Sequence, residues 1–221
     1  MMNIKSFKNI RFIFWAVSLY RNWSLNSSYN RGKKNRRVGS GIVVHSRIQF
    51  AGNNNFILLE QGAILKNCLV HISGNNNIIK IGKECIISGA ELWIEDSHCS
   101  IIIGEKTFVG HHSHLAATEN YNSITIGNNC LISSYAQIRT GDSHSIIDST
   151  GQRINKAASV DIKDHCWIGE GVKILKGTVL EMNTVVATSS VVTKSFGPNQ
   201  LIAGVPATII KSNVSWKSER I

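Results

Sequence analysis

The sequence predicts an all-β protein whose short parallel strands stack into a β-solenoid. Near the end of the chain an aliphatic residue recurs at every sixth position, at Ile162, Ile168, Ile174, Leu180, Val186 and Val192. A second repeat has a period of 22, because residues 48–55 (IQFAGNNN) align with residues 70–77 (VHISGNNN). Neither period fits the 3.6-residue turn of a helix, so both indicate short strands joined by regular corners. One unit cannot bury its own apolar side chain, and we therefore expect coils stacked about 4.8 Å apart.

The corners of the predicted coils carry small and turn-forming residues. Compact side chains recur at matching positions of successive repeats, at Ala63, Cys85, Thr107, Cys130 and Cys166. The Gly-Asn runs of residues 52–55 and 74–77 suit corners, since both residue types tolerate left-handed backbone angles. The five cysteines include no CxxC pair and no zinc-finger spacing. We therefore expect reduced, buried thiols that act as small apolar residues.

The first 37 residues differ from the rest of the chain in charge. They hold nine Lys and Arg residues and no acid, whereas the remainder has 15 basic and 14 acidic residues. A nearly neutral body argues against a nucleic-acid-binding protein. Apolar residues at helical spacing, Phe7, Ile10, Phe14 and Val17, predict a short helical segment. Its uncharged run of nine residues is far shorter than the roughly 20 needed to span a bilayer. Residues 1–37 are expected either to cap the open end of the solenoid or to contact an anionic membrane surface.

Residues 38–192 are predicted to form the β-helix domain, interrupted by one excursion loop. The spacing of the compact column jumps to 36 between Cys130 and Cys166, and residues 141–160 (GDSHSIIDSTGQRINKAASV) do not keep the six-residue pattern. Long loops in compact domains are uncommon and usually functional. Both prolines follow Val192. Proline cannot donate to a strand ladder, so we expect the regular solenoid to end there and residues 193–221 to form a C-terminal segment.

Four features occur together in the second half of the chain. They are the hexapeptide run, Asp142-Ser143-His144, Trp167-Ile168-Gly169, and an ending with Val191-Val192-Thr193-Lys194 followed by residues 203–207 (AGVPA). With these the chain resembles the left-handed β-helix (hexapeptide-repeat) acyltransferases. Within them it is most similar to the bacterial capsule and lipopolysaccharide O-acetyltransferases, which are related to maltose and galactoside acetyltransferases. The resemblance covers about residues 38–211. It implies a left-handed solenoid, a homotrimer, acetyl-CoA as the acyl donor, and active sites in the clefts between subunits.

The resemblance places the general base in the excursion loop, at His144. A sugar hydroxyl becomes a good nucleophile only as its proton is removed, and imidazole does this near neutral pH, contributing about 10²–10⁴-fold. Asp142 would either fix the tautomer of His144 or cap a turn. Glu119 would orient His144, bind a sugar hydroxyl or remain a solvated corner carboxylate. Trp167 falls at an outward position, and the resemblance sets it beside the reaction centre, where its indole N–H would donate to the developing oxyanion. Packing between subunits is the alternative role for Trp167.

The resemblance also implies where acetyl-CoA and the sugar bind. Pantetheine would follow the late coils and cations would meet the nucleotide phosphates, which gives the cofactor contacts as Gly169, Ala187, Thr188, Thr193, Lys194 and Lys211. Arg153 and Asn155 in the loop are the candidate acceptor contacts, with Arg153 suited to a negatively charged sugar. Two residues depart from the family's pattern, because relatives often have a small residue in place of Glu170 and alanine in place of Thr188. Both would narrow the path of pantetheine.

We therefore expect an acetyl-CoA-dependent O-acetyltransferase that modifies a sugar hydroxyl of a bacterial surface glycan by direct transfer. N-acetylation of a nucleotide-linked amino sugar and a non-catalytic, glycan-binding solenoid remain open as alternatives. A metal site like that of the gamma-class carbonic anhydrases is not expected, because no two histidines have the His-x4-His spacing. The expected partners are a second and third copy of the chain and a glycan acceptor, without nucleic acid. The expected location is the cytoplasm, at the inner face of the cytoplasmic membrane if residues 1–37 bind lipid.

Overall fold

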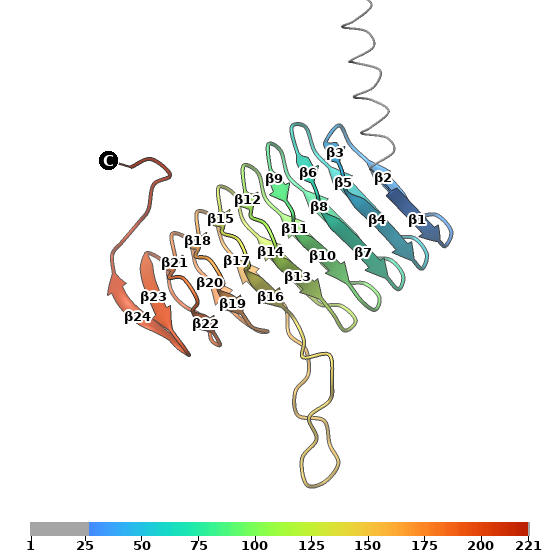
Figure 1. Cartoon of the computed structure of the whole chain (residues 1–221). Coiled ribbons are helices and arrows are strands. Elements are labelled where there is room, and N and C mark those ends of the chain that lie inside the picture. Colours follow the sequence, from blue (N-terminus) through green and yellow to red (C-terminus); the bar gives the residue numbers. More distant parts are fainter. Residues whose placement is uncertain (1–26, 221) are drawn as a thin grey trace, which may run out of the picture.

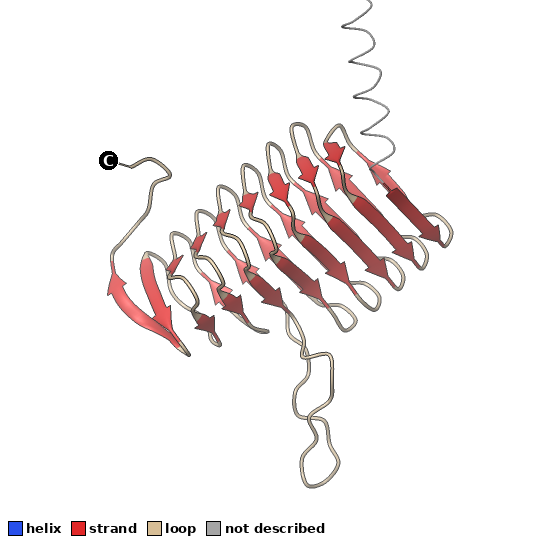
Figure 2. Ribbon diagram, in the orientation of Figure 1, coloured by secondary structure: helices blue, strands red, loops and turns tan. Residues whose placement is uncertain are grey.

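The structure is a computed structural model that describes residues 27–220, which form a three-sided β-solenoid (Figure 1). The chain passes from one sheet to the next at each corner, so that neighbouring strands of a sheet come from successive coils. The strands of each sheet run parallel, except for the last pair in the chain (Figure 2). The predicted all-β solenoid is therefore confirmed. The helical segment expected around residues 7–17 lies outside the described residues.

The strands fall into three sheets. The first sheet contains β1 (Ser27–Arg31), β4 (Arg47–Ala51), β7 (Leu69–Ser73), β10 (Glu91–Ile94), β13 (His114–Ala117), β16 (Gln137–Arg139), β19 (Lys173–Ile174) and β22 (Val191–Val192). The second sheet contains β2 (Arg36–Val38), β5 (Phe56–Leu59), β8 (Ile78–Ile81), β11 (Ser100–Ile103), β14 (Ser123–Ile126), β17 (Val160–Ile162) and β20 (Val179–Leu180). The third sheet contains β3 (Ile42–Val44), β6 (Ile64–Lys66), β9 (Ile86–Ser88), β12 (Phe108–Val109), β15 (Leu131–Ile132), β18 (Trp167–Ile168), β21 (Val185–Val186), β23 (Gln200–Gly204) and β24 (Ala207–Ser212).

Aliphatic side chains of successive coils stack in columns inside the solenoid. The register of β5, β8, β11 and β14 brings Ile57, Ile79, Ile101 and Ile124 into line, and all four are fully buried. The aliphatic residues that recur every six positions from Ile162 lie on the three sheets in turn, so that Ile162 is in line with Leu180, and they are buried in the same way. Each such side chain contributes about 1.5–3 kcal/mol relative to an exposed one, so the stacked columns form the core.

The predicted compact column lines the corner between the second and third sheets. Its polar members donate to a main-chain carbonyl of the next coil, as Thr107 Oγ1 does to Gly127 O at 2.8 Å and Cys166 Sγ does to Glu181 O at 3.3 Å. All five cysteines are free and buried, which confirms the prediction of buried thiols. Burial raises the pKa of Cys85 to about 11, so this thiol stays protonated at neutral pH.

The third asparagine of each Gly-Asn run points into the protein, which the sequence analysis missed. Asn55 and Asn77 lie at the corner between the first and second sheets and are 1% and 0% exposed. The Asn77 amide donates to the carbonyls of Ser73 at 3.0 Å and Asp96 at 2.9 Å, and its oxygen accepts the backbone N–H of Cys99 at 2.8 Å. Buried backbone groups need partners, and these side chains supply them where the chain turns away from the ladder.

The solenoid begins before Val38, where we had predicted its start. β1 pairs with β4 and β2 pairs with β5, so residues 27–37 belong to the first coil rather than to a separate segment. The many exposed cations of this coil conceal its strand pattern in the sequence. At the other end β23 continues the third sheet beside β21, and β24 pairs antiparallel with β23, so parallel order ends one strand later than predicted. The described residues include no helix that is long and apolar enough to cross a membrane.

Candidate active site

The excursion loop leaves the solenoid at the corner between the first and second sheets. It joins β16 to β17 and projects away from the stack as a long arm (Figure 1). An antiparallel bridge between Ile147 and Arg153 closes the arm. The Asp148 carboxylate caps its tip, accepting the backbone N–H groups of Thr150 at 2.8 Å and Gln152 at 2.9 Å. The predicted excursion is therefore a folded arm with its own hydrogen bonds.

A cluster of polar side chains holds the neck of this arm. The Asp142 carboxylate on the outgoing side forms an ion pair with Lys176, which comes from the corner one coil further along. Asn155 on the returning side donates to Asp142 Oδ2 at 2.9 Å and to the backbone carbonyl of His144 at 2.8 Å. The Lys176 ammonium and the Asn155 amide lower the pKa of Asp142, so this carboxylate is ionised. We call Asp142, Asn155 and Lys176 the neck clasp.

Glu119 and Arg153 form a second tie between the arm and the solenoid. Arg153 Nη1 donates to Glu119 Oε2 at 3.0 Å, and Nη2 contacts Oε1. Arg153 Nε also donates to Asn155 Oδ1 at 3.1 Å, which joins this ion pair to the neck clasp. The guanidinium lowers the pKa of Glu119. Both side chains are thus engaged with each other, and the contacts predicted for Glu119 with His144 and for Arg153 with an acidic sugar remain predictions.

His144 stands on the outgoing side of the arm with its side chain exposed. Within residues 27–220, no side chain forms a hydrogen bond with its ring. Asp142, which we expected to fix its tautomer, is held by Lys176 and Asn155 instead. The structure therefore presents an accessible imidazole on a backbone that Asn155 fixes, which is an arrangement suited to accept a proton from an incoming group.

Trp167 lies on β18 in the third sheet, away from the corner that carries the arm. Its side chain is 39% exposed and its indole N–H donates to Ser133 Oγ at 3.4 Å. The C-terminal tail crosses the outer surface here, and the Trp216 ring lies 6.0 Å from Trp167 and stacks on His165 at 4.7 Å. Trp216 also donates from its indole to the His165 carbonyl at 2.8 Å. In one chain, then, His144 and Trp167 belong to different sides of the solenoid.

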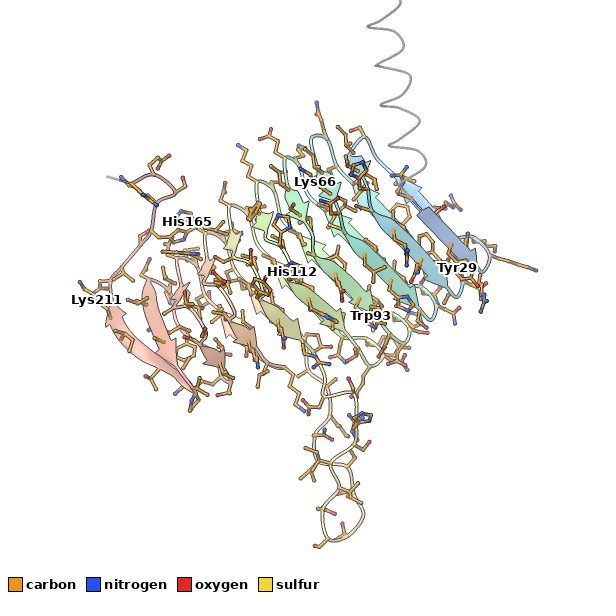
Figure 3. All side chains as sticks on the ribbon, viewed as in Figure 1. Tyr29, Lys66, Trp93, His112, His165 and Lys211 are labelled. Carbon is orange, nitrogen blue, oxygen red and sulfur yellow. The ribbon has the colours of Figure 1, made fainter. Side chains whose placement is uncertain are left out.

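A hollow of about 370 Å³ opens between this tail and the third sheet, with Phe108, Leu131, His165 and Trp216 among its lining residues. His165 lies beside Trp216 at its edge, and its Nδ1–H donates to Asn183 Oδ1 at 2.7 Å. Figure 3 labels His165 near the tail and Lys211 on the last strand. The hollow lies beside the column that contains Trp167, so the tail shapes the surface around this residue.

The predicted acetyl-CoA contacts gather in the last coils. Gly169, Ala187 and Thr188 occupy successive corners between the third and first sheets, and a Cβ at Gly169 would lie 2.7 Å from Thr188 N. Thr193 and Lys194 follow β22, and Lys211 is on β24. Only glycine therefore fits at position 169, and Thr188, Thr193, Lys194 and Lys211 are exposed. Glu170 is exposed as well, at the corner beside Gly169, so its carboxylate borders the predicted path.

In the part of the chain that the structure describes, no three His, Cys, Asp or Glu side chains converge in a group that could hold a metal ion. The chemistry-bearing side chains described above are an imidazole, two ion-paired carboxylates, an exposed indole and scattered cations. Such a set suits proton transfer beside a bound acyl donor better than it suits hydrolysis through two free carboxylates, since Asp142 and Glu119 are both tied.

Comparison with known proteins identifies the family. The polysialic-acid-specific acetyltransferase NeuO has a solved structure that matches with a TM-score of 0.83 and 30% identity over 89% of this chain and 90% of that chain. The polysialic acid O-acetyltransferase OatWY matches with a TM-score of 0.83 and 31% identity over 89% of this chain and 92% of that chain. The chain belongs to the hexapeptide-repeat acetyltransferases. The family resemblance drawn from the sequence is thus confirmed.

Sequence relatives agree with this assignment. The polysialic acid O-acetyltransferase of Escherichia coli O1:K1 / APEC is 34% identical over 117 residues, which make up 52% of this chain and 38% of that relative. The chain therefore matches well under two thirds of the length of that relative. No model of a known protein family matches the chain.

Two residues of the site were missed by the sequence analysis. Lys176 closes the neck clasp, and the six-residue pattern could have placed it in the corner next to the start of the arm, because Ile174 ends a strand two positions earlier. Trp216 covers part of the surface beside Trp167, but nothing in the polar tail around it predicts that the tail folds back over the third sheet.

Proposed function

We propose that the protein is an acetyl-CoA-dependent O-acetyltransferase that modifies a sugar hydroxyl of a bacterial surface glycan, in a capsule or lipopolysaccharide. The observation that carries this proposal is the likeness, at a TM-score of 0.83 over 89% of the chain, to two acetyltransferases whose names state polysialic acid as their acceptor. That likeness includes the solenoid on which the arm and the late coils are built. An acidic sugar polymer is thus the class of acceptor we favour.

In the proposed reaction His144 is the general base. Its neutral imidazole takes the proton of the sugar hydroxyl as the oxygen attacks the thioester carbonyl of acetyl-CoA. The tetrahedral intermediate collapses with cleavage of the carbon–sulfur bond, and the imidazolium returns the proton to the departing CoA thiolate. The ester and the free thiol balance the reaction, so no covalent acyl-enzyme is required. Trp167 would donate its indole N–H to the developing oxyanion.

For acetyl-CoA we propose the late coils. Gly169 lies where the next coil approaches closely, since a Cβ there would be 2.7 Å from Thr188 N, and Ala187 is the small residue of that next corner. The exposed ammonium groups of Lys194 and Lys211 offer charges for the nucleotide phosphates. Thr188 and Thr193 are exposed hydroxyls between them. Glu170 would repel a phosphate, so we place the phosphates toward Lys211 and the pantetheine toward Gly169.

The catalytic set would be completed by a second copy of the chain in a homotrimer. The third sheet carries an outward apolar column of Ile42, Ile64, Ile86, Phe108, Leu131 and Trp167. The arm exposes Ile146, Ile147 and Ile154 at 56%, 62% and 62%. Exposed apolar surfaces of this kind mark interaction sites, and docking the arm of one copy on the third sheet of the next would bring His144 toward Trp167.

We place the protein in the cytoplasm, with its basic N-terminal end at the inner face of the cytoplasmic membrane. The first coil contributes the exposed side chains of Arg31, Lys33, Lys34, Arg36 and Arg37, and each such cation near an anionic surface adds about 1 kcal/mol. Flotation with anionic liposomes tests this contact. A variant lacking residues 1–26 keeps the first coil intact, so equal flotation of both proteins would assign the contact to the coil, and no flotation of either would refute it.

The proposed reaction is tested by thiol release from acetyl-CoA in the presence of a panel of glycans that includes sialic acid polymers. The His144→Ala variant is expected to lose at least a hundredfold in rate, because a missing general base costs about 10²–10⁴-fold. Ser145→Ala, which alters the exposed neighbour on the same arm, is the matched control and should retain its rate. Equal rates for His144→Ala and the unsubstituted protein would refute the assignment of the base. Failure of every glycan to release thiol would refute the proposed activity.

A further inference from the structure

The neck clasp joins both segments of the arm to the solenoid through Lys176. Lys176 comes from the corner between β19 and β20, whereas its two partners come from opposite sides of the arm. Its ammonium forms the ion pair with Asp142 and donates to the backbone carbonyl of Asn155 at 2.9 Å. The Lys176 side chain thus binds both the outgoing and the returning segment of the arm, at the point where the arm leaves the solenoid.

Asn155 connects the neck clasp to the backbone around His144. Its side-chain amide donates to both Asp142 Oδ2 and the His144 carbonyl, and its side-chain oxygen accepts the backbone N–H of Ile146 at 2.7 Å. Asn155 is only 8% exposed, so water cannot readily replace these contacts. The backbone on both sides of Ser145 is therefore fixed to the same amide, and the position of His144 depends on where Asn155 is held.

A weaker tie on the outgoing side is the hydrogen bond that Arg139 Nη2 on β16 donates to Ser143 Oγ at 3.3 Å, where water can replace it. Gly141 packs against the corner, where a Cβ would lie 2.5 Å from Thr118 Oγ1, but it offers no side chain to bind. The Glu119–Arg153 ion pair ties the returning side alone. Without the Lys176 ammonium, Asp142 would lose its ion-pair partner, and at the neck the two segments would be joined through Asn155. The next links, the Ile154–Ile146 hydrogen bond and the Ile147–Arg153 bridge, lie further out along the arm.

We propose that Lys176 is a positioning residue for acetyl transfer, which fixes the direction of the arm and thereby the place of the His144 imidazole. This rests on the proposed function. Lys176 does not contact the reacting atoms, and it acts through Asp142 and Asn155. Without Lys176 the His144 imidazole would occupy a range of positions instead of one. Catalysis by an oriented group depends on ångström-scale placement, so the loss of Lys176 should lower kcat and leave the binding of acetyl-CoA unchanged.

Three variants test this role. Lys176→Met removes the ammonium and keeps much of the aliphatic stem, Lys176→Arg restores a cation that can reach both acceptors, and Lys173→Met is the matched control. Lys173 is exposed on β19 in the same coil and forms no ion pair within residues 27–220. For each variant we would measure kcat, the KM for acetyl-CoA, the melting temperature and hydrogen exchange of the Ile146 and Ile154 amides.

For Lys176→Met we expect kcat to fall about 10- to 100-fold, with the KM for acetyl-CoA within about twofold, and amide exchange in the arm to rise about tenfold or more. Lys176→Arg should recover most of kcat, and Lys173→Met should match the unsubstituted protein in both readouts. Faster exchange with unchanged kcat would overturn the positioning role, and unchanged exchange in Lys176→Met would overturn the clasp itself. If the unsubstituted protein transfers no acetyl group, the proposed function and the role in transfer both fail, while exchange still reports on the clasp.

Discussion

Replacing Asn77 by alanine probes how the corners of the solenoid are held together. Asn77 is fully buried, and its side chain makes three hydrogen bonds that bind two coils, to the carbonyls of Ser73 and Asp96 and from the N–H of Cys99. Alanine keeps the backbone but removes every one of these contacts. The three main-chain groups would then lie at a buried corner without a partner.

The size of the effect follows from counting those groups. A net contribution of about 0.5–1.5 kcal/mol per hydrogen bond gives a loss of about 2–4 kcal/mol, with the upper part of the range favoured because buried groups left unsatisfied keep their full desolvation cost. In a protein of this size, about 1 kcal/mol shifts the melting temperature by roughly 2–4 °C. We therefore expect Asn77→Ala to melt about 4–16 °C below the unsubstituted protein.

Thermal unfolding followed by circular dichroism at constant protein concentration measures this difference. Asn75→Ala is the matched control, since Asn75 lies in the same corner, is exposed, and accepts the backbone N–H of Asn53 at 2.8 Å where water can take its place. The control should change stability by no more than about 0.5 kcal/mol. Equal melting temperatures for the two variants would refute the view that inward asparagines support the corners.

Two further predictions concern the site. Trp167→Ala should lower kcat/KM for acetyl transfer by about tenfold or more, because the indole N–H that would donate to the oxyanion is lost. The control Trp93→Ala, on the first sheet, should leave kcat/KM within about twofold. Equal effects of the two variants would count against a role for Trp167. The pKa values of Asp142 and Glu119 are lowered in the folded protein. Their ion pairs with Lys176 and Arg153 are therefore fully formed above the pKa values of the unfolded chain, about 3.9 for Asp and 4.3 for Glu. The ion pairs are lost as the pH falls through the lower pKa values of the folded protein. Hydrogen exchange in the arm, corrected for its intrinsic pH dependence, should therefore accelerate at some pH below about 4, before the whole protein unfolds in acid. An exchange rate that stays flat from about pH 6 down to the acid unfolding of the protein would show that these ion pairs do not hold the arm.

The solenoid could be predicted because its signal repeats. The aliphatic residues at every sixth position from Ile162 and the 22-residue repeat of the Gly-Asn runs each indicate the stacking of coils several times. The pairing of β1 and β2 with the coil that follows escaped detection because the outward positions of these strands are crowded with cations. The inward turn of Asn77 escaped for a different reason. Asparagine at a corner suits left-handed backbone angles and buried hydrogen bonding equally well, and only the three-dimensional corner shows which of the three in a run is buried.

The site was predictable residue by residue but not as an arrangement. The motif placed His144 on an excursion loop, and the structure has it there. Nothing in the spacing of Asp142 and Glu119 indicated that both carboxylates would be taken by Lys176 and Arg153, because these cations approach from parts of the chain 34 residues away. Contacts between distant coils depend on the stack as a whole, and a local motif carries no information about them.

The measurement that tests the central claim most directly is complementation between two inactive variants. His144→Ala and Trp167→Ala are co-expressed with different tags, and the mixed oligomers are isolated through both tags and assayed for acetyl transfer. If the base of one copy works on the third sheet of the next, every mixed trimer pairs an intact arm with an intact sheet at one of its three sites, and activity should return to about one third of the unsubstituted level. A mixed preparation no more active than either variant alone would contradict a site shared between two copies.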